Sequence, residues 1–229
     1  MLHQNARPLS VESELVQINC DGARLHGMLA VPPSAIGLVV FAHGSGSSRH
    51  SPRNKLIARA VREQCNAATL LVDLLSDTEE TVDEHTHAMR FDVPLLAQRV
   101  RGLCEWASRD RRTRPLPIGL FGASTGAAAS LIAASEIPDK IACVVTRGGR
   151  PDLAGVVALS TVRAPTLFIV GSNDDVVLRL NREALPMIPD ARLEVVLGAS
   201  HLFAEPGTLQ EAATLAARFY ARHLRARAR

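Results

Sequence analysis

The stretch IGLFGASTGAAASLIAAS, residues 118–135, decides the fold of this chain. Residues 118–121 are a short apolar run typical of a buried strand, and residues 126–135 form an alanine-rich segment typical of a helix. Between them stands Gly122-Ala123-Ser124-Thr125-Gly126, a GxSxG pattern at the expected strand-to-helix turn. Such a turn lifts a serine hydroxyl above the edge of a sheet, and the flanking glycines leave room for the strained backbone. The structural alternative is a glycine-rich joint without chemistry, so Ser124 needs partners to count as a nucleophile.

The order of strand and helix recurs along the rest of the chain. The expected strands are residues 15–18, 24–31, 37–42, 68–72, 118–121, 141–145, 167–170 and 193–197. The expected helices are residues 52–64, 94–107, 126–135, 152–160, 176–185 and a last one that opens at Thr208, with Glu211 as its capping box. This alternation implies an α/β fold with a mostly parallel central sheet and helices on both faces. The first two strands, joined at Asp21-Gly22, are expected as an antiparallel edge.

The composition is that of one globular domain. The chain has 229 residues, of which 47% are apolar and 21% charged, and this length suffices for a full core. We therefore expect a single domain over residues 1–229, with residues 1–12 and 225–229 as loose termini. The net charge of +3 is too small and too scattered to indicate a nucleic-acid partner.

The sequence carries no signal for secretion or for a membrane. Residues 1–11 lack the apolar core of a signal peptide, and the charge-free residues 116–135 read as a strand followed by a helix. The four cysteines form no CxxC pair and are expected to be buried and reduced. A cytoplasmic protein without metal, cofactor, membrane or nucleic-acid partner is expected, and the sequence leaves the oligomeric state open.

A serine nucleophile needs a base and an acid that orients the base. In folds with a serine turn, the acid and then the histidine follow the serine, each at the end of a later strand. Asp174 and His201 both meet this requirement. Asp175 is an alternative for the acid, and a helix N-cap is the structural alternative for Asp174. His223 also follows Ser124, but it lies among arginines in the last expected helix, which indicates a solvated helix end.

Acyl transfer also needs donors for the negative oxygen of the intermediate. The N–H group of Thr125, directly after the serine, is one expected donor. The other is the N–H group of Ser45, in the loop His43-Gly44-Ser45-Gly46-Ser47-Ser48. His43 is expected to contact the substrate there. The competing interpretation is a phosphate loop, but the GxxxxGK[ST] pattern is absent from the sequence.

Together, GASTG around Ser124, GSND around Asp174, GASHLF around His201 and FAHGSG at residues 41–46 resemble an α/β-hydrolase. The closer resemblance, over roughly residues 15–225, is to the small dienelactone-hydrolase-like serine hydrolases. Its motifs are HGSGSSRHSPRN (43–54), RFD (90–92), RGGRPDLA (147–154) and SHLFAEPGTL (200–209).

This resemblance implies the α/β-hydrolase fold and a Ser-His-Asp triad, without specifying the substrate. Some relatives are fused to a phosphoribosyltransferase domain, for which this chain has no room. The namesake enzymes carry a cysteine nucleophile where this chain has Ser124, which favours ordinary ester chemistry.

Three groups of polar residues have both a functional and a structural interpretation. Arg147 and Arg150 follow a strand at the expected active edge, where they would clamp a substrate carboxylate or pair with Asp152. Residues 49–53 would line the pocket or simply start a helix at Ser51-Pro52. The acidic run of residues 77–84 with the nearby histidines reads as an exposed loop rather than a metal site.

Only about twenty residues separate the strand ending near Thr146 from the one starting near Pro165, which leaves room for one helix and no lid domain. The leading hypothesis is a serine hydrolase that cleaves a small carboxylic ester or lactone through an acyl-enzyme. The alternatives are an acyltransferase, thioesterase or small peptidase with the same triad, or a non-catalytic relative used for binding.

Overall fold

The computed structural model describes residues 11–226, so most of the predicted loose termini lie outside the described residues. Eight strands form one sheet in the order β1-β2-β4-β3-β5-β6-β7-β8. The strands are β1 (Glu14–Cys20), β2 (Ala23–Ala30), β3 (Leu38–Ala42), β4 (Ala68–Val72), β5 (Ile118–Ala123), β6 (Ile141–Arg147), β7 (Thr166–Gly171) and β8 (Ala191–Val196). Strand β2 pairs antiparallel with both β1 and β4, and the remaining pairs are parallel. The predicted parallel sheet with an antiparallel edge is confirmed.

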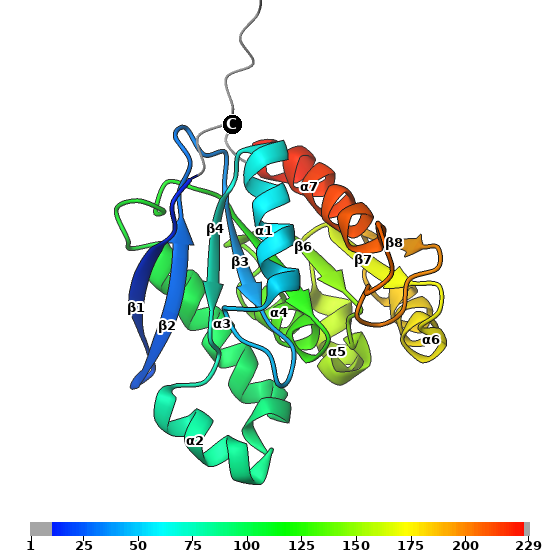
Figure 1. Cartoon of the computed structure of the whole chain (residues 1–229), viewed down its shortest axis with the longest axis horizontal. Coiled ribbons are helices and arrows are strands. Elements are labelled where there is room, and N and C mark those ends of the chain that lie inside the picture. Colours follow the sequence, from blue (N-terminus) through cyan, green and yellow to red (C-terminus); the bar gives the residue numbers. More distant parts are fainter. Residues whose placement is uncertain (1–10, 227–229) are drawn as a thin grey trace, which may run out of the picture.

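Helices cover both faces of the sheet (Figure 1). The helices are α1 (Pro52–Cys65), α2 (Asp77–Thr86), α3 (Val93–Ala107), α4 (Thr125–Glu136), α5 (Gly155–Thr161), α6 (Asp175–Ala184) and α7 (Thr208–Ala226), with short 3-10 turns at Met89–Phe91, Pro151–Ala154 and Leu185–Met187. Helices α1 and α7 pack on one face, and α3 to α6 pack on the other. The chain therefore has the layered α/β architecture that the alternation of elements predicts, which is the α/β-hydrolase fold that the resemblance implies.

The central strands are buried on both sides because helices cover both faces. All five residues of β3 and all five of β4 are buried, which explains why these strands read as unbroken apolar runs. Successive residues enter opposite cores: Val40 faces the α3 side, whereas Phe41 faces the α1 side and lies 4.8 Å, ring centre to ring centre, from Phe121. Tyr220 of α7 is fully buried in the second core and donates a hydrogen bond of 2.7 Å to the Leu120 carbonyl.

Helix α2 is the main difference from the sequence prediction. The acidic run is mostly exposed as expected, but it forms a helix instead of a loop, and Asp83 within it is buried. Ser76 caps this helix: its hydroxyl accepts from the Glu79 N–H, and the Glu79 carboxylate accepts from the Ser76 N–H. The prediction of a capping box at the start of α7 is wrong. The Glu211 N–H donates to the Gly207 carbonyl, and the Thr208 hydroxyl donates to the Glu205 carbonyl.

All four cysteines are buried, as predicted. Burial raises the pKa of the Cys20 thiol to about 11 and that of the Cys104 thiol to about 12, so neither is a thiolate near neutral pH. Over the described part of the chain, no helix is long and apolar enough to cross a membrane. This agrees with the prediction that residues 116–135 are a strand and a helix.

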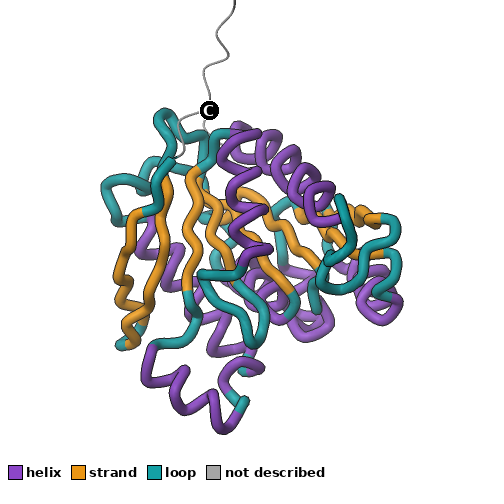
Figure 2. The backbone as a smooth tube through the Cα atoms, viewed as in Figure 1, coloured by secondary structure: helices purple, strands orange, loops and turns teal. Residues whose placement is uncertain are grey.

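The carboxyl and amino ends of the parallel strands lie at opposite edges of the sheet, and different parts of the chain gather at each edge. The loops that leave β3 and β4 gather at the carboxyl edge of the parallel strands, the lower edge in Figure 2, and α2 projects beyond it. The described ends of the chain lie at the opposite edge. Strand β1 starts beside Leu29 at the end of β2, and Leu224 of α7 packs against Gly37, just before β3 begins. In open α/β sheets, ligands bind at the carboxyl edge.

Candidate active site

Ser124 stands at a sharp turn between β5 and α4. Its backbone has φ 50° and ψ −119°, a conformation that is uncommon for a residue with a side chain. The flanking glycines permit this turn, because a Cβ on Gly122 would lie 2.4 Å from the Cα of Ala127 and a Cβ on Gly126 would lie 2.4 Å from the Ala42 carbonyl oxygen. The predicted strand–turn–helix around GxSxG is therefore present, with the geometry of a nucleophile turn.

Asp174 and His201 meet across the ends of β7 and β8. The Nδ1 atom of His201 lies 2.6 Å from Oδ2 of Asp174. Because a carboxylate can only accept, Nδ1 carries the proton and Nε2 is left with a lone pair. Asp174 occupies the N-cap position of α6 but makes no capping bond with its side chain, whereas Asp175 lies exposed in the first turn. Of the two candidate acids, the structure pairs Asp174 with the histidine.

Ser124 and His201 lie on either side of the segment that follows β6. The Ser124 N–H bonds to the Arg147 carbonyl at 3.3 Å, and a Cβ on Gly148 would lie 3.3 Å from Cε1 of the His201 ring. Among the described residues, no hydrogen bond joins the Ser124 hydroxyl to His201. His223 instead packs on Phe219 within α7, with ring centres 4.3 Å apart.

The loop after β3 lies directly against the serine turn. A Cβ on Gly44 would lie 3.0 Å from the Cβ of Ser124, so only glycine lets the loop approach so closely. The Ser45 N–H, one of the two predicted oxyanion donors, donates to the Thr125 hydroxyl at 3.0 Å. The structure thus brings both predicted donor residues together and gives the Thr125 side chain a contact that the sequence did not predict.

His43 holds this loop to the neighbouring strand. Its Nε2 accepts from the Leu74 N–H at 3.1 Å, and its Nδ1 lies 2.9 Å from the Gly44 carbonyl oxygen. These partners require a neutral ring with the proton on Nδ1. Burial, only partly offset by the bond to Gly44, lowers the pKa of His43 below its usual value. Both nitrogens bond to the backbone, which indicates that His43 positions the loop, and because the ring also lines the pocket, its substrate contact stays a prediction.

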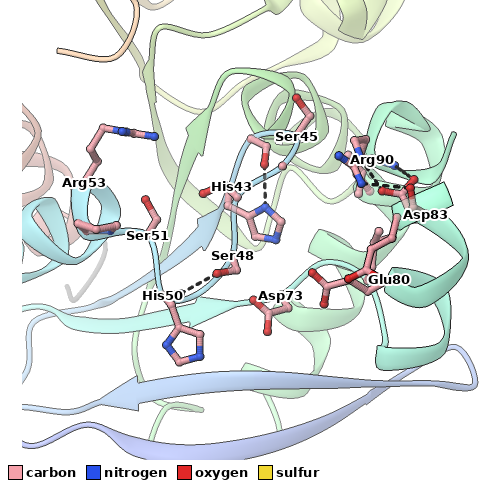
Figure 3. A pocket seen from close by; sticks show the side chains of 17 residues that line it. His43, Ser45, Ser48, His50, Ser51, Arg53, Asp73, Glu80, Asp83 and Arg90 are labelled. Atoms are coloured by element: carbon pink, nitrogen blue, oxygen red, sulfur yellow. Dashed lines mark hydrogen bonds and ion pairs between the residues drawn. The ribbon is translucent and has the colours of Figure 1, made fainter. Parts of the chain in front are cut away.

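A cavity of about 510 Å³ opens beside the serine turn (Figure 3). One wall is the loop of residues 43–48, and a second is the start of α1, with His50 and Arg53. The third wall comes from α2 and the following turn, with Glu80, Glu84 and the Asp83–Arg90 ion pair. Ser124 does not line this cavity but adjoins it through Gly44. The α2 wall was not predicted, and the Ser76-x-x-Glu79 capping pattern is the signal that could have revealed it.

The two arginines predicted at this edge have different environments. The Arg150 guanidinium forms two hydrogen bonds, of 2.8 and 2.7 Å, with the Asp152 carboxylate, the structural alternative for this residue. Arg147 is only 7% exposed, and its Nε and Nη1 have no hydrogen-bond partner among the described residues. Within the same part of the chain, no cluster of three or more histidine, cysteine, aspartate or glutamate side chains could hold a metal ion.

No family model matches this chain. Two curated relatives, from the CDC 1551 and H37Rv strains of Mycobacterium tuberculosis, both bear the name "Putative phosphoribosyl transferase". They are 48% identical over 215 residues, which cover 93% of this chain and 47% of theirs. The chain thus spans about half the length of the curated relatives it matches.

Solved structures match over nearly the whole chain. A dienelactone hydrolase from Anabaena variabilis is 46% identical, with a TM-score of 0.91 over 94% of this chain and 99% of its own. An α/β serine hydrolase without lid from Xanthomonas campestris is 21% identical, with a TM-score of 0.69 over 94% of each chain. The second similarity concerns the fold alone.

Proposed function

Because this chain belongs to the dienelactone hydrolase family of α/β-hydrolases, we propose that it is a serine hydrolase that cleaves small carboxylic esters or lactones. The proposal assigns Ser124 as the nucleophile, His201 as the base and Asp174 as the acid that orients the base. The observation that carries it is the 2.6 Å bond between His201 and Asp174, at the edge of the sheet where the strained Ser124 turn emerges.

The reaction would proceed in two stages. His201 Nε2 takes the hydroxyl proton as Ser124 attacks the acyl carbon, and the imidazolium then gives this proton to the departing alcohol. In the second stage, His201 takes a proton from water as this water attacks the acyl carbon, and the imidazolium then gives that proton to the Ser124 oxygen as the bond to the carboxylic acid breaks. Asp174 stabilises the imidazolium in both stages. The Thr125 N–H would bind the negative oxygen of each tetrahedral intermediate, and the Ser45 N–H would join it by exchanging its bond to the Thr125 hydroxyl for one to that oxygen.

The serine chemistry departs from that of the namesake family, whose nucleophile is a cysteine. A serine hydroxyl depends fully on its base, since it is not ionised near neutral pH. The oriented His201 supplies this base. The transferase name of the curated relatives belongs to proteins about twice as long, and the half that this chain matches has a hydrolase fold.

The Ser124→Ala variant tests the proposal. We expect it to fold like the wild type, because it removes only a hydroxyl, and to lose roughly 10⁴- to 10⁶-fold in kcat for ester hydrolysis. The measurement is turnover of short p-nitrophenyl esters, beside covalent labelling by a fluorophosphonate probe. Turnover within tenfold of the wild type would remove Ser124 from the mechanism.

A second measurement identifies the class of acyl substrate and the molecule that accepts the acyl group from the enzyme. Short esters, lactones and thioesters compared on the same enzyme would identify the preferred acyl compound. Added alcohols or amines would reveal an acyltransferase, since they would yield a new ester or amide instead of the free acid. Labelling by the probe without turnover of any such compound would favour a binding protein that keeps the site.

A further inference from the structure

The guanidinium of Arg147 is a buried charge beside the serine turn. Arg147 ends β6 next to Ala123 of β5, and its carbonyl accepts from the Ser124 N–H. The residue is 7% exposed, and no carboxylate pairs with it among the described residues. Its Nε and Nη1 are buried without a hydrogen-bond partner in that same part of the chain. Leaving such donors unpaired is costly, so the site is incomplete as it stands.

The surroundings of Arg147 are cationic and aromatic. Its guanidinium carbon lies 5.6 Å from the ring centre of Phe203, two residues beyond His201. Burial, and next the positive charge of Arg53, lower the pKa of Arg147 to about 10. Arg53 lies in the first turn of α1 and lines the cavity, and its own Nε is buried without a partner in the described structure. The positive charge of Arg53 at the cavity wall thus reaches Arg147, which has no carboxylate partner among the described residues.

Three other shielded arginines are paired with carboxylates, whereas Arg53 and Arg62 form no ion pair among the described residues. Arg99, 5% exposed, lies 2.6 Å from the Glu79 carboxylate, and Arg49 forms an ion pair with Asp73. Arg90 pairs with Asp83 on the opposite wall of the cavity. These three arginines have carboxylate partners, whereas Arg147, the most buried arginine beside Ser124, has none among the described residues.

We propose that Arg147 and Arg53 bind an anionic group of the substrate, and that this group is a phosphate monoester. This inference rests on the proposed ester hydrolysis and adds the class of substrate: a phosphorylated ester or lactone. Two guanidinium groups carry two positive charges, which match a phosphate dianion better than a single carboxylate. The positive end of the α1 dipole adds positive potential at this wall.

The charge of the cavity would also orient such a substrate. Glu80 and Glu84 line the α2 wall, and neither forms an ion pair with another described residue. They would repel a phosphate from that side and leave the Arg53 side as its place. The reacting carbonyl would then lie toward Ser45 and Ser124.

Binding can be measured without turnover. Inorganic phosphate, added at constant ionic strength, should raise the melting temperature of the wild type in a saturable way. Arg147→Met and Arg53→Met should each abolish this rise. The matched control is Arg62→Met, which removes a half-buried guanidinium from the other end of α1, where it bonds to Thr69, and should keep the rise.

Without phosphate, Arg147→Met should melt at or above the wild-type temperature, because it removes an uncompensated buried charge. A lower melting temperature, together with a phosphate response that persists, would show a structural arginine and overturn the proposal. If Arg147→Met does not fold, Arg53→Met decides, since it lies at the cavity wall and its side chain is only partly buried.

Kinetics then test the link to the reaction. Three esters of one phenol are compared, with acyl chains that end in methyl, carboxylate or phosphate. In Arg147→Met, the ratio of kcat/KM for the phosphate ester to that for the methyl ester should fall by about tenfold or more. An unchanged ratio, or a wild-type preference for the carboxylate ester, would overturn the phosphate assignment. If the wild type hydrolyses none of the three, the proposed function fails, while the phosphate melts still decide whether the anion site exists.

Discussion

The Asp174 side chain bonds to His201 instead of capping the helix that it precedes. It stands at the N-cap position of α6, where an aspartate usually accepts a backbone N–H, but its carboxylate turns to His201. Asp174→Asn should therefore lower kcat for ester hydrolysis by at least about a hundredfold, because the imidazolium loses its anionic partner. Asp175→Asn, in the exposed first turn, is the matched control and should stay within a few-fold of the wild type. A larger loss of kcat in Asp175→Asn than in Asp174→Asn would instead assign Asp175 as the acid of the triad.

Thr125 has a second task besides its backbone N–H. Its hydroxyl accepts a hydrogen bond of 3.0 Å from the Ser45 N–H and so holds the loop against the serine turn, and the Ser45 N–H would exchange this bond for one to the substrate oxygen during the reaction. Thr125→Val keeps the shape and removes the acceptor, and should lower kcat by about tenfold to a hundredfold with little change in KM. Thr125→Ser keeps the hydroxyl and should recover most of the rate. Equal rates for both variants would show that the contact is incidental.

The loop after β3 depends on a neutral histidine. In the folded protein, burial keeps the pKa of His43 below its usual value, whereas in the unfolded chain the ring takes up a proton near pH 6.5. Below that pH the unfolded state therefore binds more protons, and stability falls as the pH drops from 7.5 toward 5. His43→Gln should show a smaller fall. The measurement is the urea midpoint of the wild type and of His43→Gln at pH 7.5 and at pH 5.5. All other titrating groups are the same in the two proteins, so a difference in the fall reports on His43. An identical fall in the two would refute the assignment.

The strands and most helices were predictable because each has a strong local signal. Strand β3 is an unbroken apolar run, and α1 begins at Ser51 and Pro52, which cap and open a helix. Helix α2 lacks an apolar face, because Val82 is its only large aliphatic side chain, and its capping pattern is its main local signal. It is held instead by its capping box and by the Glu79–Arg99 ion pair, a contact between distant parts of the chain.

The site was predictable to the same degree. Ser124, Asp174 and His201 each follow a recognisable strand, so their order along the chain implied a common edge. The pairing of Arg150 with Asp152 was one of two open alternatives, and a sequence cannot choose between them because both use the same residues. The bonds of His43 to the backbone depend on how closely β3 and β4 approach, which only the folded chain determines.

The sheet separates two apolar cores, one under α1 and α7 and one under α3 to α6. Because both cores include residues of the same strands, we expect them to unfold together. Tyr220→Phe removes the hydrogen bond to Leu120 in the α7 core and should cost about 1 kcal/mol. The chain has a single tryptophan, Trp106, which packs on the other core. Urea unfolding followed by Trp106 fluorescence and by far-UV circular dichroism should shift by the same amount. A shift in only one signal would mean that the two faces unfold separately.

The placement of the chain ends has a practical side. Leu224 and the start of β1 lie at the amino edge of the sheet, and the five residues of β3 put roughly 17 Å of strand between that edge and the cavity. A tether attached near either described end would therefore hold the protein from the amino edge of the sheet, opposite the cavity. Anchored on a resin or a sensor surface through such a tether, the protein would turn its cavity toward the solution, and immobilisation would leave access for small esters and phosphate alike.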